Sequence, residues 1–198
     1  MLTLGLAAVA CFGGSGDTPQ LLPPDLNVVA VKSQTGEVGP SGVLYLAIDS
    51  PDIAVTSLSF TTSGATGRLT VEAASLSGPP PETTPPASGD VFQYIQIVGD
   101  GTGLGGVLNV TITFEVDRSW IAARGFSESD VALERHSEGW TLLPTTAIGQ
   151  SDTTVVYKAI SPSLSLFAIT ADDPERRLAR LVDALPAATE TLGPISTP

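Results

Sequence analysis

The stretch Leu108-Asn109-Val110-Thr111-Ile112-Thr113-Phe114-Glu115-Val116-Asp117 decides the fold, because apolar and polar residues alternate through all of it. Successive side chains of a β-strand point to opposite faces. The predicted apolar face holds Leu108, Val110, Ile112, Phe114 and Val116, and the predicted polar face holds Asn109, Thr111, Thr113, Glu115 and Asp117. Such a strand covers a core with one face and meets water with the other.

Other short runs of β-branched and apolar residues predict further strands. They occupy residues 27–31, 43–48, 53–61, 68–73, 92–98, 131–135, 140–143, 153–159 and 164–169. Residues 63–67 are expected to form a hairpin loop, residues 77–89 an exposed proline-rich loop, and residues 119–125 a short helical turn. About nine short strands joined by Gly/Pro turns predict an all-β chain, an Ig-like antiparallel β-sandwich.

The chain divides into three predicted parts. Residues 1–24 form a leader and linker, residues 25–171 the β-sandwich, and residues 172–198 a short helix with a Thr/Pro-containing tail. Asp173 followed by Pro174 is typical of a helix start. The apolar stripe of this amphipathic helix holds Leu178, Leu181, Val182 and Leu185. We expect it to dock on the sandwich or to contact another chain.

Several landmarks resemble the PGF-pre-PGF domain, a module of archaeal cell-surface proteins, over roughly residues 26–170. They are Ser119-Trp120 after the alternating strand, Val131-x-Leu133-x-Arg135, Gly139-Trp140, Leu143-Pro144-Thr145 and Ser165-x-Phe167-Ala168-Ile169, with Val91-Phe92-Gln93-Tyr94-Ile95 upstream. After Pro162 the family usually has Gly-Phe, where this chain has Ser163-Leu164. The resemblance implies a β-sandwich module outside an archaeal cell, with cell-envelope or surface proteins as partners.

Composition agrees with an external location. The 198 residues are 42% apolar, and 21 acidic residues stand against nine basic ones. A surface this acidic repels nucleic acid and anionic lipid headgroups, so nucleic acid is not expected as a partner. This excess of acidic residues fits either a protein in a salt-rich medium, in which screening limits self-repulsion, or an ordinary acidic secreted protein.

The leader contains the only cysteine of the chain, so no intrachain disulfide is expected. Residues 2–12 are almost entirely apolar but too short to span a bilayer as a helix. Ala8-Val9-Ala10-Cys11 resembles a lipobox, which would attach a lipid to Cys11 and hold the domain on the membrane. A plain cleaved signal and a buried apolar N-terminus are the alternatives, since no basic residue precedes Lys32.

Asn109-Val110-Thr111 is an N-glycosylation sequon on the predicted polar face, where Asn109 would carry a glycan or remain a plain exposed side chain. Trp120 and Trp140 are candidates for a ligand platform, but core anchoring is the commoner use of tryptophan. Arg135 is expected to point toward the core and to pair with a carboxylate, for which Glu115 and Asp117 are candidates.

Catalytic and metal-binding residues are sparse. His136 is the only histidine and is expected in a solvent-exposed hairpin turn, which leaves a nucleophile without a base. Asp49 and Asp52 fall in a predicted turn, where aspartate serves turn chemistry. The loop beginning at Asp100 lacks the further acidic ligands of a calcium loop. We therefore expect no enzyme, no cofactor and no metal site.

Two functions remain open from the sequence. One is a non-enzymatic surface module, a structural or adhesive element of an archaeal envelope. The other is a lipid-anchored protein that binds carbohydrate or calcium through Trp120, Trp140 or its acidic turns. Exposure of the two indole rings distinguishes them.

Overall fold

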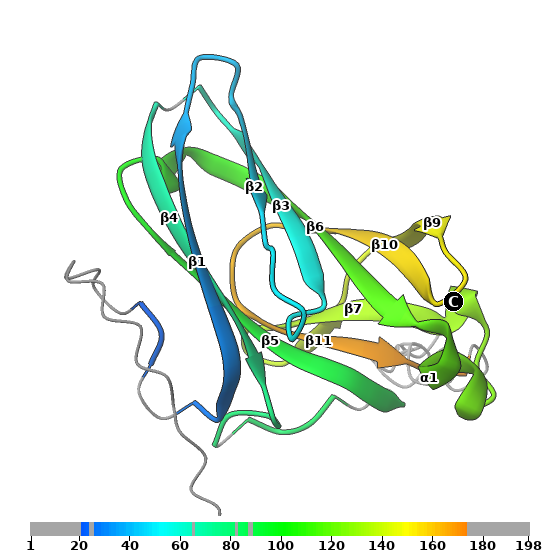
Figure 1. Ribbon diagram of the computed structural model, residues 1–198. Helices are drawn as coiled ribbons and strands as arrows, with labels where there is room; N and C mark the ends of the chain where they lie inside the picture. Colours follow the sequence, from blue (N-terminus) through cyan, green and yellow to red (C-terminus); the bar gives the residue numbers. More distant parts are fainter. Residues whose placement is uncertain (1–20, 24–25, 65, 82, 87–88, 174–198) are drawn as a thin grey trace, which may run out of the picture.

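The computed structural model describes residues 21–23, 26–64, 66–81, 83–86 and 89–173. Within these residues two antiparallel sheets face each other (Figure 1), with strand orders β1-β4-β5-β11-β7-β8 and β2-β3-β6-β10-β9. The predicted all-β antiparallel sandwich is confirmed. The predicted C-terminal helix and the leader with Cys11 lie outside the described residues.

The two sheets contain every strand of the described chain. The six-stranded sheet consists of β1 (Val28–Val38), β4 (Gly67–Leu76), β5 (Asp90–Asp100), β11 (Leu166–Ala171), β7 (Val131–His136) and β8 (Trp140–Leu142). The five-stranded sheet consists of β2 (Val43–Ala47), β3 (Val55–Thr62), β6 (Val107–Asp117), β10 (Thr154–Ser161) and β9 (Thr145–Gln150). One short helix, α1 (Arg118–Ala123), follows β6, where a helical turn was expected.

The main core lies between the sheets. Its large fully buried side chains come from both layers and include Phe60, Phe114, Tyr157, Phe167 and Ile169. Phe114 and Tyr157 are directly opposite across β6 and β10 and stack with their ring centroids 5.4 Å apart. Burial of these inward faces is the main stabilising contribution, because apolar side chains on both sheets leave water together.

Strand β6 confirms the predicted alternation except at its start. Val110, Ile112, Phe114 and Val116 are fully buried, but Leu108 is 58% exposed. The pairing with β3 shifts at this point, since Thr61 faces Asn109 while Thr62 faces Val107. The irregularity leaves Leu108 unpaired and turned away from the core, so its predicted core position was wrong.

The connection at residues 63–67 is not a hairpin, contrary to expectation. It carries the chain from β3 in one sheet to β4 in the other. The turn before β2 likewise joins β1 to the opposite sheet. Here the sheets approach closely at Gly36, where an added Cβ would lie 2.6 Å from a methyl group of Leu44. A glycine at this position lets the edge of the sandwich close.

Two elements exceed the expected strands. β1 extends seven residues beyond the predicted end, through the polar segment from Lys32 to Val38. β9 was not expected as a strand, and all its residues except Thr145 are exposed. The described residues form eleven strands, against about nine expected. Both additions are edge strands, in which neither face needs to be apolar.

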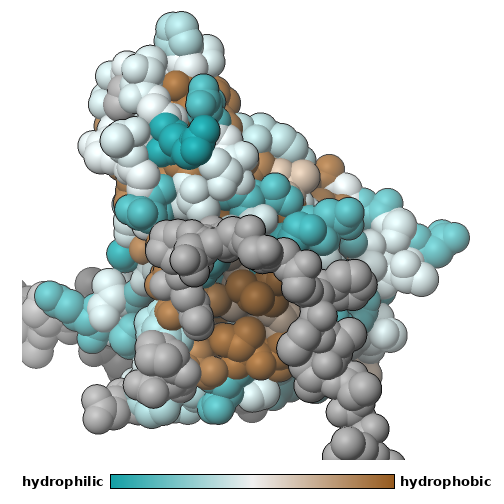
Figure 2. Space-filling model, turned by 60° about the vertical axis from the view of Figure 1, so that its left-hand side comes forward, coloured by the Kyte–Doolittle hydropathy of each residue, from teal (hydrophilic) through white to brown (hydrophobic). Residues whose placement is uncertain are grey.

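A second apolar cluster covers the outer face of the six-stranded sheet. Its buried members are Leu22, Ala74, Leu76 and Leu166, with Leu26, Tyr94, Val98 and Trp140 packed against them. Figure 2, in which the left-hand side of Figure 1 comes forward, shows apolar residues gathered in a hollow on this side of the molecule. The sheet is thus apolar on much of both faces, unlike a sheet with one wet face.

Glu72 on this outer face is only 7% exposed. Its Oε2 atom accepts hydrogen bonds from the amides of Leu21 and Leu22 at 3.1 and 3.2 Å. The carboxylate therefore fastens the segment that precedes β1 onto β4. A buried charge needs such partners, and charge-assisted bonds to backbone N–H groups are among the stronger hydrogen bonds.

Candidate functional site

Asn109 lies on the outer face of the five-stranded sheet, as expected, and its side chain is half-buried. On this face it stands beside Thr61 of β3. Exposed Leu108 precedes it. The sequon therefore lies near the start of β6, directly after the irregularity at Leu108, with one side facing solvent.

Trp120 is half-buried at the end of the sandwich and packs against the main core from α1. Its ring meets Phe92 edge-on, with centroids 5.1 Å apart. The guanidinium of Arg124 lies 4.6 Å from the Trp120 ring centroid, and this arginine also pairs with Asp90 at 3.0 Å. Phe92 and Arg124 thus occupy two sides of the indole, which anchors α1 to β5.

Trp140 belongs to a different cluster, on the outer face of the six-stranded sheet. Its Nε1 atom donates a hydrogen bond to the carbonyl oxygen of Thr84 at 2.6 Å. His136 meets the indole edge-on at 5.0 Å, and Tyr94 lies 6.2 Å away on the far side of β11. The two tryptophans therefore do not form one shared platform, and each has an anchoring role.

A groove of about 590 Å³ runs beside the Trp140 group. It is bordered by Pro80 and Pro81 of the proline-rich loop, by Gln96 of β5 and by His136. Burial, and then the negative charge of Glu134, raise the pKa of nearby Tyr94 above its ordinary value. Its hydroxyl consequently stays protonated at neutral pH.

His136 is not the exposed turn residue expected from the sequence. It is the last residue of β7, and its half-buried ring packs on Trp140. The Ser165 hydroxyl donates to the backbone carbonyl of His136 and not to its imidazole. The contact fixes β7 beside the start of β11 but does not activate the serine, because a general base must accept the proton through its ring nitrogen.

The expected partners of Arg135 were wrong. Glu115 and Asp117 belong to β6 in the opposite sheet, and Arg135 forms no ion pair with any described residue. Its Nη2 atom instead donates a hydrogen bond to the hydroxyl of Ser163 at 2.7 Å. Arg135 thus holds the loop before β11, at the position where Ser163-Leu164 replaces the Gly-Phe of the resembled family.

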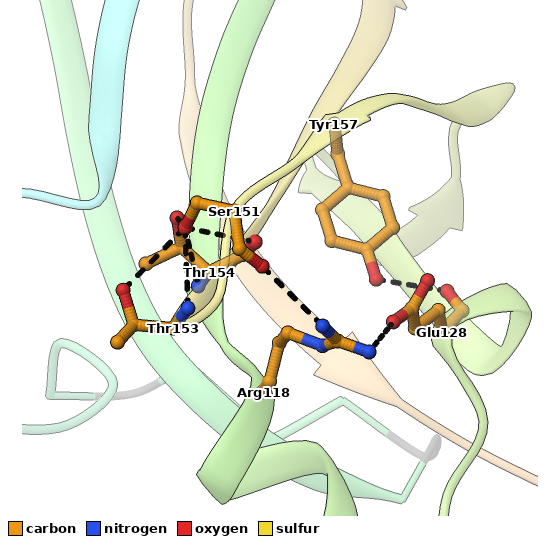
Figure 3. Close-up of polar contacts among 6 residues, drawn as sticks. All are labelled: Arg118, Glu128, Ser151, Thr153, Thr154 and Tyr157. Carbon is orange, nitrogen blue, oxygen red and sulfur yellow. Dashed lines mark hydrogen bonds and ion pairs between the residues drawn. The ribbon is translucent and has the colours of Figure 1, made fainter.

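A polar network ties the end of the sandwich together (Figure 3). Arg118 of α1 bridges the Glu128 carboxylate at 3.2 Å and the Ser151 carbonyl at 3.3 Å. The Tyr157 hydroxyl donates to the Glu128 carbonyl at 2.9 Å. Burial, followed by the charges of Glu128 and Asp130, raises the pKa of Tyr157 well above its ordinary value. These contacts connect α1, the 3-10 turn at Glu128–Asp130 and β10, and they have a structural role.

Acidic side chains do not gather into a metal site in the part of the chain that the structure describes. Asp49 and Asp52 are exposed in the turn before β3, as expected. Gln93 fastens that turn by donating to the Asp52 carbonyl at 3.0 Å and accepting from the Ala54 amide at 2.8 Å. In the loop after Asp100, the backbone bonds to itself and to β4.

An exposed apolar edge was not anticipated from the sequence. β1 and β2 are neighbouring edge strands of the two sheets, and five apolar side chains flank this edge: Val28, Val29, Val31, Val43 and Tyr45. Their exposed fractions run from 41% to 64%. The available signal was the run Val28-Val29-Ala30-Val31, which has no polar residue and therefore does not alternate.

None of the described helices has the length and apolar character required to cross a membrane. Comparisons with protein-family models, with curated proteins and with solved structures found no match.

Proposed function

We propose that this chain is a non-enzymatic module displayed outside the cell, where it serves as a structural or adhesive element of an archaeal type of envelope. Its partners are other envelope or surface proteins. The acidic composition, the sequon at Asn109 and the resemblance to the PGF-pre-PGF domain support the location.

The observation that carries the adhesive role is the apolar edge at β1 and β2. Exposed edge strands offer unpaired backbone groups, and exposed valines add apolar area that gains from burial against a partner. Val29 and Val31 flank the edge on the outer side of one sheet, and Val43 and Tyr45 on the outer side of the other. Natural edges are usually protected by charges, so an edge this apolar favours an interaction surface.

The location is tested by labelling intact cells with a membrane-impermeant amine reagent. Lys158 on β10 is exposed and is the appropriate target. Labelling of Lys158 on intact cells, and its loss in Lys158→Arg, is the expected result. Labelling that appears only after cell lysis contradicts display outside the cell.

The adhesive edge is tested with Val29→Lys/Val31→Lys in the full chain. We expect a smaller fraction of this variant to sediment with the cell envelope than of the unaltered protein. Ile148→Lys on β9, an exposed apolar residue of a different edge strand, is the matched control and should sediment normally. Equal sedimentation of all three proteins would remove the role assigned to β1.

The alternative is a lipid-anchored carbohydrate-binding protein, with the lipid on Cys11. The groove bordered by His136, whose ring packs edge-on against Trp140, favours it, because rings flanked by polar groups suit sugar rings. Quenching of tryptophan fluorescence by soluble oligosaccharides, lost in Trp140→Phe/His136→Ala, supports this function. The described residues bring no three acidic, histidine or cysteine side chains together for a metal, so no observation favours calcium binding.

A further inference from the structure

Two connections between the sheets meet at one end of the sandwich. The first contains the 3-10 turn Leu104–Gly106 and joins β5 to β6. The second, residues 162–165, joins β10 to β11, and its Ser165 carbonyl accepts a hydrogen bond from the Ile97 amide of β5 at 2.9 Å. Residues of both connections line a pocket of about 420 Å³. A volume of this size is within the range of small-ligand sites.

The wall of this pocket is mainly apolar. Ile97, Leu104, Val107 and Leu164 line it with aliphatic side chains. Ile97 belongs to the main core, and the other three pack against that core. The two leucines lie close to Gly99, where an added Cβ would be 2.7 Å from a methyl group of Leu164 and 3.6 Å from one of Leu104. A wall continuous with the core favours a ligand with an apolar body.

Ser163 adds a hydroxyl to this wall. Its Oγ atom accepts the hydrogen bond from Arg135 Nη2 at 2.7 Å. A serine hydroxyl also has one proton to donate. Within the described residues this proton has no acceptor, since the other bonds of Ser163 use its backbone amide and carbonyl. The hydroxyl can therefore donate to a ligand in the pocket while Arg135 holds it from behind.

Arg135 brings a positive charge beside the pocket. It shares the inward-facing side of β7 with Val131 and Leu133 of the main core, and it is half-buried. Its Nε atom is buried without a hydrogen-bond partner among the described residues, which also supply no carboxylate to its guanidinium. A cation removed from water normally has such a carboxylate. This one lacks it although acidic residues outnumber basic ones 21 to nine.

We propose that this pocket binds a small aliphatic carboxylate. The apolar body of the ligand packs on Ile97, Val107 and Leu164, and its carboxylate accepts hydrogen bonds from the Ser163 hydroxyl and the Arg135 guanidinium. Arginine suits this anion, because its N–H groups match the geometry of a carboxylate. A single cation in an apolar wall favours a monoanion over a phosphate, which needs more donors. This binding does not depend on the proposed function.

Titration of the full chain with octanoate, followed by amide chemical shifts, tests the proposal. The amide signals of Gly99, Val107 and Ser163 should shift and saturate, whereas those of β9 should stay unchanged. Octanol, which has the same chain length and no charge, should bind at least about tenfold more weakly, because it lacks charge-assisted hydrogen bonds. Equal affinity for octanoate and octanol, or no saturable shift at these amides, overturns the proposal.

Two substitutions assign the anion recognition to its residues. In Arg135→Gln the preference for octanoate over octanol should fall by about tenfold or more. Ser163→Ala should also lower this preference while leaving Arg135 in place, and it decides the matter if Arg135→Gln does not fold. Arg118→Gln is the matched control, because Arg118 follows the opposite end of β6 from Val107 and should leave the preference unchanged. A preference that survives in folded Arg135→Gln or in Ser163→Ala overturns the assigned recognition.

Leu164→Phe tests the place of binding. The larger side chain occupies space in the pocket, so this variant should bind both octanoate and octanol at least about tenfold more weakly than the unaltered protein. Unchanged affinity for both ligands means that they bind elsewhere, and it overturns the site.

Discussion

Tyr157 gives the most detailed prediction, because its ring and its hydroxyl have separate roles. The ring stacks on Phe114 in the main core, with centroids 5.4 Å apart. The hydroxyl donates to the carbonyl oxygen of Glu128 at 2.9 Å. Tyr157→Phe keeps the ring and removes only the hydrogen bond, so it isolates the contribution of the network at this end of the sandwich.

The expected loss follows from one hydrogen bond. Its net contribution is about 0.5–1.5 kcal/mol, and the carbonyl left without this donor adds a desolvation cost. We expect Tyr157→Phe to lower the free energy of unfolding at pH 7 by about 1–2 kcal/mol. Tyr45→Phe is the control, because Tyr45 is an exposed edge residue and its change should stay within about 0.5 kcal/mol.

The pH dependence gives a second arm. The pKa of Tyr157 is raised by burial and by neighbouring carboxylates, from an ordinary value of 10.0. Below this value both folded and unfolded chains keep the phenolic proton, so its contribution to stability is fully present. At higher pH the unfolded chain releases the proton first, so stability is lost as pH rises toward the folded pKa. The phenylalanine variant lacks this loss.

Urea unfolding followed by tryptophan fluorescence measures both effects. At pH 7 the unaltered protein should be more stable than Tyr157→Phe, and the difference should shrink as the pH rises above about 10. If Tyr157→Phe is as stable as the unaltered protein at pH 7, the stabilising hydrogen bond is refuted. If the difference in stability does not change with pH, the raised pKa is refuted.

Four other substitutions test three separate features. Phe114→Ala should lower the free energy of unfolding, measured in urea, by about 3–5 kcal/mol, and Leu108→Ala should lower it by less than about 0.5 kcal/mol. Similar losses for the two variants would contradict the irregularity at the start of β6. Glu72→Ala should speed hydrogen exchange at the Leu22 amide by about tenfold or more, and unchanged exchange would show that the carboxylate does not hold this segment. Gly101→Ala should cost about 1–3 kcal/mol in thermal unfolding, because its φ is +121° and an added Cβ would collide with a β4 carbonyl. A neutral effect would contradict that loop.

The sequence correctly predicted those strands of the sandwich that bury one face and expose the other. In β6 every second residue from Val110 to Val116 is buried, so alternation and structure agree. It did not predict β9, because a nearly fully exposed edge strand has no core face to impose a pattern. The sequence also did not predict the irregularity that exposes Leu108, because this irregularity depends on the pairing register with β3, a strand distant in sequence.

The candidate site was less predictable, because it depends on which strands become neighbours. Arg135 was expected to meet a carboxylate of β6, but β6 is in the other sheet and Ser163 is the partner. His136 was expected in solvent, yet the β7–β8 pairing places it beside Trp140. Strand order follows from the packing of the whole domain and is not encoded in any single segment.

The central claim is that this sandwich is displayed outside the cell, and mass spectrometry of the protein purified from its native cells tests it most directly. We predict a glycan on peptides that contain Asn109, together with removal of the leader or a lipid adduct on Cys11. An unmodified Asn109 in a protein that retains an unprocessed leader from Met1 would contradict the account.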